Sequence, residues 1–270
     1  MATRRHVPRK RFGQHFLVDA AIVERIVGAI DPGRSDHVVE IGPGLGALTV
    51  PLLARLDHLH VIEIDRDLSE RLRERHPADR LTVHQADALE FDFAALPAPL
   101  RVAGNLPYNI STPLLFHAAA AASRCTDLHF MLQQEVVDRM VAEPSASEYG
   151  RLSVMLQYRF RVEQLFEVPP RAFRPEPKVR SALVRLVPRS ADELDARSES
   201  GLSRVVARAF SMRRKTLRNT LAGVMSGSEL EQIGIDPGKR AQELPVAAFV
   251  TIANRLADSG TGPRRRALAK

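Results

Sequence analysis

A short β-branched segment followed by three closely spaced glycines is the feature that most constrains the fold of this chain. Residues 38–41 read Val-Val-Glu-Ile, and Gly42, Gly44 and Gly46 follow at alternate positions, ahead of an apolar helical pattern. This order predicts a strand, a tight turn and a helix. Glycine allows positive φ and close approach of a ligand, and a helix N-terminus presents unpaired N–H groups. The turn is therefore a candidate binding site.

The spacing of the glycines separates two classes of ligand. The dinucleotide fingerprint Gly-x-Gly-x-x-Gly cradles a pyrophosphate, whereas this chain has Glu-x-Gly-x-Gly-x-Gly from Glu40 to Gly46. An acidic residue on the strand just before three alternating glycines resembles the motif of class I methyltransferases, which bind S-adenosylmethionine. A nicotinamide oxidoreductase is the competing interpretation, and a turn that uses glycine for packing alone is the third.

Strand and helix patterns alternate along the first two thirds of the chain. Strands are expected at 37–41, 58–65, 81–84, 100–103, 128–132, 162–168 and 181–187, and helices at 19–30, after the glycine turn to about 56, and at 68–75, 113–122, 134–142 and 150–160. Strands with helical crossovers form a mostly parallel sheet, here of seven strands, that binds ligands at the carboxyl ends of its strands. Four polar residues fall at or near such ends, and we expect them to meet: Glu40, Glu63, Asp87 and Asn105.

The strand patterns stop at about Pro188. From Ser203 the sequence predicts helices, with further short ones at 228–233 and 246–257. We therefore expect a Rossmann-like α/β domain over 1–188, which begins with an irregular basic arm at 1–17, and a small α-helical RNA-binding domain over 189–270 with a basic tail.

The distribution of charge indicates a polyanionic partner. Residues 1–17 hold five basic side chains and no acidic one, and residues 189–270 hold 15 basic and 9 acidic ones, whereas the middle of the chain carries a net charge of −4. An acidic body with basic ends suits a nucleic acid held at its flanks, although a solvated surface with a basic tail is the plainer interpretation. A single cysteine, Cys125, excludes an internal disulfide and a cysteine-rich metal site. With no apolar segment long enough to cross a bilayer, we expect a cytoplasmic protein without a metal.

Two acidic residues beyond the glycines match a nucleoside cofactor. Glu63 closes the second strand about 20 residues after the glycines, where a carboxylate can accept both ribose hydroxyls. Asp87 follows the third strand and can accept a hydrogen bond from an adenine amine, and the backbone of Ala88 can accept the base edge. A strand-end acid such as Glu63 is often only solvated, but its position after the glycines favours the functional interpretation, whereas Asp87 taken alone is equally well explained as a loop residue.

The most specific tetrapeptide of the chain is Asn105-Leu106-Pro107-Tyr108. An adenine exocyclic amine is a poor nucleophile, because its lone pair is delocalised into the ring. The Asn105 side-chain carbonyl and the Leu106 main-chain carbonyl can each accept one N–H and aim the lone pair at a methyl donor. Pro107 stiffens the turn, and Tyr108 offers a ring on which the base stacks. A tight Asn-x-Pro turn with a packed tyrosine is the alternative.

Several motifs occur together in a fixed order. They are Gly13-Gln14-His15-Phe16-Leu17, the 40–46 loop, Glu63, Asp87, residues 105–108 with Asn109-Ile110-Ser111, Val168-Pro169-Pro170 to Phe173 with Pro175-x-Pro177-Lys178-Val179, the segment 210–219, and Gly234-Ile235-Asp236-Pro237. With these motifs the chain resembles the universal small-subunit ribosomal RNA adenine dimethyltransferases over roughly residues 9–257. The nearest rival is the large-subunit RNA adenine methyltransferase group that confers macrolide resistance. A non-catalytic ribosome-assembly or RNA-binding factor on the same fold is the third candidate.

The resemblance implies a reaction, a cofactor and a set of site residues. S-adenosylmethionine would methylate the N6 amines of two adjacent adenosines in the hairpin loop near the 3′ end of small-subunit RNA, twice each, and leave S-adenosylhomocysteine. The enzyme would act as a monomer on a pre-30S particle. The cofactor residues implied are Gln14, His15, Leu17, Gly42, Gly44, Glu63, Ile64, Asp87, Ala88 and Asn105. The catalytic residues implied are Asn105, Leu106, Pro107, Tyr108 and Phe173, with Tyr108 and Phe173 on either side of the extruded base.

Basic residues at both ends of the chain are expected to hold the RNA. They are Arg9, Lys10 and Arg11 in the arm, and Arg213, Arg214, Lys215 and Arg218, which we expect on a basic helix over 213–218 that grips phosphates. A solvated helix face is the alternative for any one of these arginines. Position 15 is asparagine in some relatives of the family, so that the histidine of this chain is a departure.

Overall fold

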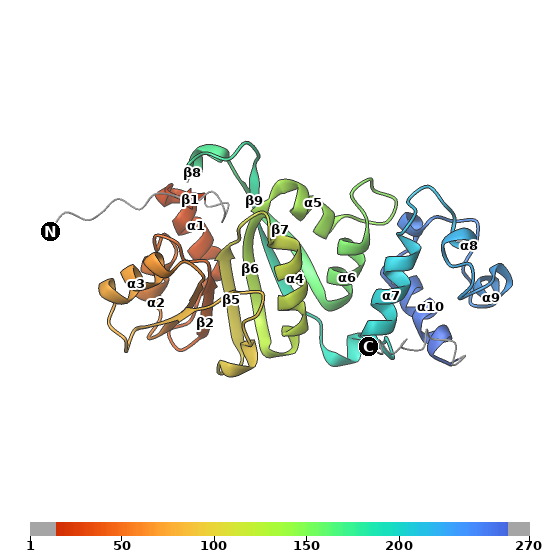
Figure 1. Cartoon of the computed structure of the whole chain (residues 1–270), viewed down its shortest axis with the longest axis horizontal. Coiled ribbons are helices and arrows are strands. Elements are labelled where there is room, and N and C mark those ends of the chain that lie inside the picture. The colour runs from red at the N-terminus through yellow and green to blue at the C-terminus, as the bar shows by residue number, and fades with distance from the viewer. Residues whose placement is uncertain (1–14, 259–270) are drawn as a thin grey trace, which may run out of the picture. The chain divides into compact units, whose positions relative to one another are not determined.

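The computed structural model describes residues 15–258, which divide into two compact units (Figure 1). Within the described range, the first unit contains residues 15–137 and 161–188, and the second contains 138–160 and 189–258. Gln14, Arg9, Lys10 and Arg11 of the predicted sites lie outside the described residues, as does the basic tail. The second unit thus includes residues 138–160, which the sequence analysis grouped with the sheet. The assignment of a separate function to each unit stays a prediction.

A seven-stranded sheet forms the centre of the first unit, as the strand patterns predicted. Its strands are β2 (His37–Ile41), β3 (Leu59–Glu63), β4 (Leu81–Gln85), β5 (Leu100–Asn105), β6 (Cys125–Gln133), β7 (Phe160–Val168) and β9 (Ser181–Pro188), in the order β4-β3-β2-β5-β6-β9-β7. The pairs β2–β3, β3–β4, β2–β5 and β5–β6 are parallel, and β6–β9 is antiparallel. The fold is therefore the mostly parallel α/β sheet expected for class I methyltransferases.

The order of the strands places the ligand site. The chain runs outward from β2 through β3 to β4 and then returns to the other side of β2 with β5, so that the strand order reverses between β2 and β5. In open α/β sheets, ligands bind at the carboxyl ends of the strands where this reversal occurs. Glu40 near the end of β2 and Asn105 at the end of β5 flank this point.

The helices of the first unit cover the sheet with apolar side chains. They are α1 (Ala20–Ile30), α2 (Thr49–Arg55), α3 (Arg66–Arg75), α4 (Ser111–Ala120) and the start of α5 (Gln134–Val141). Asp19 caps α1 as predicted, because its carboxylate accepts from the backbone N–H groups of Ala21 and Ile22. Buried side chains of α1, such as Ile26, and of α2, such as Leu52, join one hydrophobic cluster with Val38, Leu59 and Val61 of the sheet.

A second, two-stranded sheet closes the first unit at one edge, and the sequence analysis missed it. β1 (Phe16–Leu17) pairs antiparallel with β8 (Phe173–Arg174), and the two lie side by side in Figure 1. The backbone N–H of Val18 adds a bond of 2.8 Å to the carbonyl of Ala172. The prediction that the chain before Val18 is too irregular for a strand was therefore wrong for Phe16 and Leu17.

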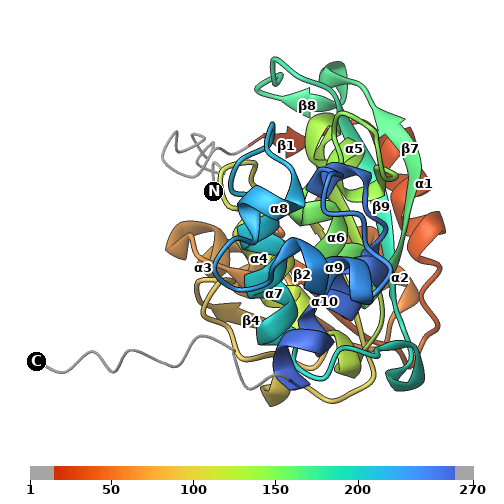
Figure 2. The same cartoon turned by 90° about the vertical axis from the view of Figure 1, so that its right-hand side faces the viewer.

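The second unit is helical, as predicted for the C-terminal region. It contains α6 (Arg151–Arg159), α7 (Glu199–Ala209), α8 (Leu217–Thr220), α9 (Gly227–Gln232) and α10 (Val246–Asp258), of which Figure 2 gives a view. Its own core joins α6 to the later helices: Val154 and Tyr158 cluster with Leu202 and Val206 of α7 and Phe249 of α10. This packing is the reason that residues 151–159 belong to the helical unit. No helix in residues 15–258 is long and apolar enough to cross a membrane.

The predicted basic helix over 213–218 is wrong. Helix α7 ends at Ala209, and residues 210–215 form turns in which the Ser211 hydroxyl donates to the Arg208 carbonyl at 2.7 Å. The backbone N–H groups of Leu217 and Arg218 donate to Lys239 and Pro237 instead of to residues four positions earlier. Because each N–H has one main partner, these long-range bonds exclude a continuous helix. Arg213, Arg214 and Lys215 lie on an exposed turn, and Arg218 lies in α8.

Candidate active site

The glycine turn after β2 has the backbone conformation that its sequence predicted. Gly42, Gly44 and Gly46 have φ of +68°, +57° and +90°, a region in which L residues are strained. A Cβ on Gly44 would lie 3.1 Å from the ring of Phe16, and one on Gly42 would point at the Asn105 carbonyl at 3.8 Å. The turn therefore leaves a backbone surface that a ligand can approach closely, between β1 and the end of β5.

Glu63 ties the end of β3 to the glycine turn. Its Oε2 accepts from the backbone N–H of Gly44 at 3.2 Å, and its Oε1 accepts from Asp65 at 2.9 Å. Burial raises the pKa of this carboxyl, and the two backbone N–H donors counteract that rise. Two residues beyond β4, Asp87 accepts from the backbone N–H of Leu89 at 2.9 Å. Both carboxylates line the same pocket as the glycine turn.

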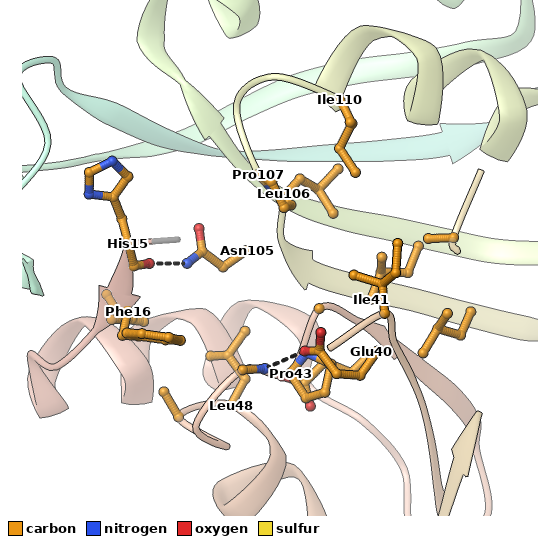
Figure 3. A pocket seen from close by; sticks show the side chains of 18 of the residues that line it. His15, Phe16, Glu40, Ile41, Pro43, Leu48, Asn105, Leu106, Pro107 and Ile110 are labelled. Atoms are coloured by element: carbon orange, nitrogen blue, oxygen red, sulfur yellow. Dashed lines mark hydrogen bonds between the residues drawn. The ribbon is translucent and has the colours of Figure 1, made fainter. Parts of the chain in front are cut away.

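This pocket gathers most of the predicted cofactor residues at one place (Figure 3). Together with its mouth it encloses about 1160 Å³ of empty space. The predicted cofactor residues that line it are His15, Leu17, Gly42, Gly44, Glu63, Ile64, Asp87, Ala88 and Asn105. Of the predicted catalytic residues it contains Asn105, Leu106, Pro107 and Tyr108. All of these residues belong to the first unit.

The side chain of Asn105 has a defined orientation in the pocket. Its Nδ2 donates to the main-chain carbonyl of His15 at 3.0 Å, and Figure 3 shows the Oδ1 directed away from that bond. The Leu106 N–H donates to Met131 on the neighbouring strand β6, so that the backbone after Asn105 is also held. The amide oxygen is thereby left as the acceptor at this end of β5.

Tyr108 lies near Asn105 in the same pocket, and both its hydroxyl and its ring make contacts. Its hydroxyl shares a hydrogen bond of 2.8 Å with Ser181, and its ring stacks on that of His15 at a centroid distance of 5.6 Å and an interplanar angle of 27°. Burial raises the pKa of the phenol, which therefore stays neutral near pH 7. Phe173 is only 1% exposed, packs in the core cluster with Leu17, and is absent from the lining of the pocket in the described chain.

Three residues in or near the pocket received no individual chemical role in the sequence analysis. Glu40 is 2% exposed and accepts from the Thr49 hydroxyl at 2.6 Å, and its burial raises the pKa to about 8. The Phe16 ring lies against Gly44, and Phe16 belongs to β1, which pairs with β8. A Cβ on Gly104 would lie 2.5 Å from the Ile41 carbonyl oxygen, which makes glycine necessary where β5 runs beside β2. The acid before the glycines was a sequence signal for Glu40, whereas Phe16 and Gly104 depend on strand register.

The basic residues of the second unit lie at its surface. Arg213, Arg214, Lys215 and Arg218 are exposed, and the Arg213 guanidinium donates to the main-chain carbonyl of Ser147. Among residues 15–258 no group of three His, Cys, Asp or Glu side chains is placed to hold a metal ion.

The fold and the pocket define a class I methyltransferase, in which Glu40, Gly42, Gly44 and the strand-end acid Glu63 line one pocket. Two solved structures share this fold along nearly the whole chain. A dimethyladenosine transferase from Plasmodium falciparum has a TM-score of 0.80 and 26% identity, covering 91% of this chain and 98% of that one. The 23S rRNA methyltransferase ErmE has a TM-score of 0.69 and 26% identity, covering 90% and 99%.

Curated relatives and a family model identify the particular family. The ribosomal RNA small subunit methyltransferase A of Chromobacterium violaceum is 60% identical over 257 residues, covering 95% of this chain and 98% of the relative. The protein of the same name from Aromatoleum aromaticum is 61% identical, covering 93% and 95%. The model of the ribosomal RNA adenine dimethylase family matches residues 5–258. The chain belongs to this family, and it is an rRNA methyltransferase that uses S-adenosylmethionine.

Proposed function

We propose that this chain dimethylates the N6 amines of two adjacent adenosines in the hairpin loop near the 3′ end of small-subunit rRNA. Relatives named ribosomal RNA small subunit methyltransferase A, 56–61% identical over 92–96% of the chain, support the choice of RNA. The orientation of Asn105 carries the proposal, because its carbonyl oxygen is the acceptor that an adenine amine needs beside the glycine turn.

The residues of the pocket fit the cofactor. S-adenosylmethionine supplies an electrophilic methyl group. The backbone of Gly42 and Gly44 leaves space that a side chain would fill, and Glu63 presents a carboxylate at the strand end where ribose hydroxyls are bound in such folds. We assign Asp87 to the adenine amine of the cofactor and the backbone of Ala88 to its base edge. Ile64 and Leu17 contribute apolar lining that excludes water.

The chain's own part in the reaction is to orient the target amine. The Asn105 Oδ1 and the Leu106 carbonyl each accept one N–H of the amine, which turns its lone pair towards the methyl donor and favours a more tetrahedral nitrogen. Pro107 stiffens the turn that presents these two acceptors. Tyr108 offers a neutral ring, fixed by Ser181, against which an extruded base can stack. After transfer the nitrogen is cationic and loses one proton to solvent, so that the secondary amine keeps one N–H for the second round, in which it again needs an acceptor.

The alternative functions have less support. The similarity to the 23S rRNA methyltransferase ErmE is at 26% identity, far below that to the small-subunit relatives. A non-catalytic assembly factor would have no need of the Asn105 amide beside the glycine turn, and this chain retains the amide, Glu63 and Asp87 in one pocket.

We further propose that the enzyme works as a monomer in the cytoplasm, on a pre-30S particle. The exposed turn with Arg213, Arg214 and Lys215, together with Arg218, would contact RNA phosphates, because phosphate contacts position a substrate without reading its sequence. The arm residues Arg9, Lys10 and Arg11 are assigned the same role from the sequence alone.

The function is tested by incubating the enzyme with small ribosomal subunits from a methyltransferase-deficient strain and labelled S-adenosylmethionine. Mapping of the modified nucleotides should place the label on two adjacent adenosines near the 3′ end of the small-subunit RNA. Label on large-subunit RNA instead, with none on small subunits, would refute the proposal. The Asn105→Ala variant serves as the control for contaminating activity.

A further inference from the structure

We propose that the imidazole of His15 occupies the stacking face of Tyr108 in the RNA-free enzyme, and that the target adenine enters only when this ring moves away. The proposal rests on the proposed function, because it concerns the site of the target base. It gives His15 a part in admitting the base that is separate from any contact with the cofactor.

The distance between the two rings leaves no space for a base. The centroids are 5.6 Å apart and the ring planes are 27° apart, which is ordinary aromatic stacking. A base between two rings requires two stacking steps of roughly 3.4 Å each, or about 7 Å in total. The rings of His15 and Tyr108 therefore have to separate before any base can lie against the covered face.

The covered face is the one next to the reacting group. The main-chain carbonyl of His15 lies 3.0 Å from the Nδ2 of Asn105. We infer that an adenine whose amine is held by the Oδ1 of the same amide lies beside His15 and meets Tyr108 on the side that His15 covers. Phe173 offers no competing surface in this state, because it is 1% exposed in the core cluster.

Hydrogen bonds hold each ring from a different segment of the chain. The Nδ1 of His15 is 2.7 Å from the carbonyl oxygen of Pro175, which follows β8, and the Tyr108 hydroxyl bonds to Ser181 at the start of β9. Entry of the base therefore costs the stacking contact and the bond to Pro175. The contact from Asn105 uses the main chain of His15, so that it persists when the side chain is changed.

Substitution at position 15 separates this role from the others. His15→Asn, which removes the ring, should lower the KM for small subunits of a methyltransferase-deficient strain about two- to tenfold, the range expected for one aromatic pair. Because the main-chain contact to Asn105 is kept, the KM for S-adenosylmethionine should change less than the KM for the subunits. His15→Phe, which keeps a ring, should stay closer to the unchanged enzyme. His117→Asn is the matched control, because the Nε2 of His117 also bonds to a main-chain carbonyl, that of Phe91 at 2.8 Å, away from this pocket.

A direct measurement of base entry complements the kinetics. An RNA hairpin that carries 2-aminopurine at the target position should become fluorescent at lower concentrations of His15→Asn than of the unchanged enzyme. A raised or unchanged RNA KM in His15→Asn, or an effect confined to the KM for S-adenosylmethionine, would overturn the proposal while the unchanged enzyme still methylates small subunits. Failure of the unchanged enzyme to modify those subunits would refute the proposed function instead.

Discussion

Gly104 is expected to tolerate no side chain unless the sheet shifts. In Gly104→Ala, the new Cβ would lie 2.5 Å from the Ile41 carbonyl oxygen and 3.1 Å from a methyl carbon of Leu106. An ordinary carbon–oxygen contact is about 3.3 Å, so β5 and β2 would have to separate by about 0.8 Å. Overpacking costs about 1–3 kcal/mol. Because the clash is with the backbone of a paired strand, we expect the free energy of unfolding to fall by about 3 kcal/mol, the upper end of this range.

The same shift should also reduce activity. Ile41 precedes the glycine turn and Asn105 follows Gly104, so that a separation of the strands moves Asn105 away from Gly42. A displacement of this size in a positioning group can lower the rate about 100-fold. We therefore expect kcat of the folded variant to fall by that order, in addition to the loss of stability.

Urea denaturation of the unchanged chain and of two alanine variants provides the test. Gly28→Ala is the matched control, because Gly28 is exposed in α1 and a Cβ there would meet nothing within 4 Å. Alanine at a helix interior should raise the free energy of unfolding by about 0.5–1 kcal/mol. The same chemical change is thus expected to act with opposite sign at the two sites. If Gly104→Ala unfolds within about 0.5 kcal/mol of the unchanged chain, the argument from strand separation fails.

Three further predictions concern the pocket and the RNA-binding surface. Asn105→Ala should lower kcat about 100-fold or more while calorimetry still detects cofactor binding, and normal methylation would remove Asn105 from the mechanism. Glu40 has its pKa raised from 4.5 to about 8, so that folding takes up a proton between these values and the unchanged chain loses stability as pH rises through them. As pH rises from 4.5 to 8, the free energy of unfolding of Glu40→Gln should therefore increase relative to that of the unchanged chain by on the order of a few kcal/mol. Denaturation curves that show no pH-dependent difference between the two proteins would contradict this. Changing Arg214 and Lys215 to Ala should weaken RNA binding and make the slope of log binding constant against log salt concentration shallower by about one to two, as measured by filter binding. An unchanged slope would exclude both residues from contact with RNA phosphates.

The sheet and the pocket were predictable because their signals are local. Each parallel strand is an apolar segment followed by a polar residue, and the carboxyl ends of parallel strands meet at one edge. Glu63, Asp87 and Asn105 could therefore be placed in one site from the sequence. The N-cap at Asp19 was likewise recognisable, since its carboxylate acts on the next few residues.

The remaining features depend on contacts between distant segments. A strand of two residues such as β1 carries no periodicity, and its partner β8 lies far along the chain. The basic residues of 213–218 were expected on a helix, yet the N–H groups of Leu217 and Arg218 donate to the carbonyl oxygens of Lys239 and Pro237. An isolated phenylalanine such as Phe173 has the same sequence signature in a core as on a binding surface. Its stacking role therefore stays a prediction, and its burial in the core gives that role no support.

The pairing of β1 with β8 has a consequence for the synthesis of the protein. A nascent chain that has already exposed the glycine turn still lacks the strand that holds Phe16 and Leu17, and it lacks β9, which lies between β6 and β7. At 5–20 residues per second, a growing chain spends seconds in this incomplete state. The binding pocket is therefore complete only when nearly all of the first unit has left the ribosome. Partly synthesised chains on translating ribosomes do not yet carry a complete active site.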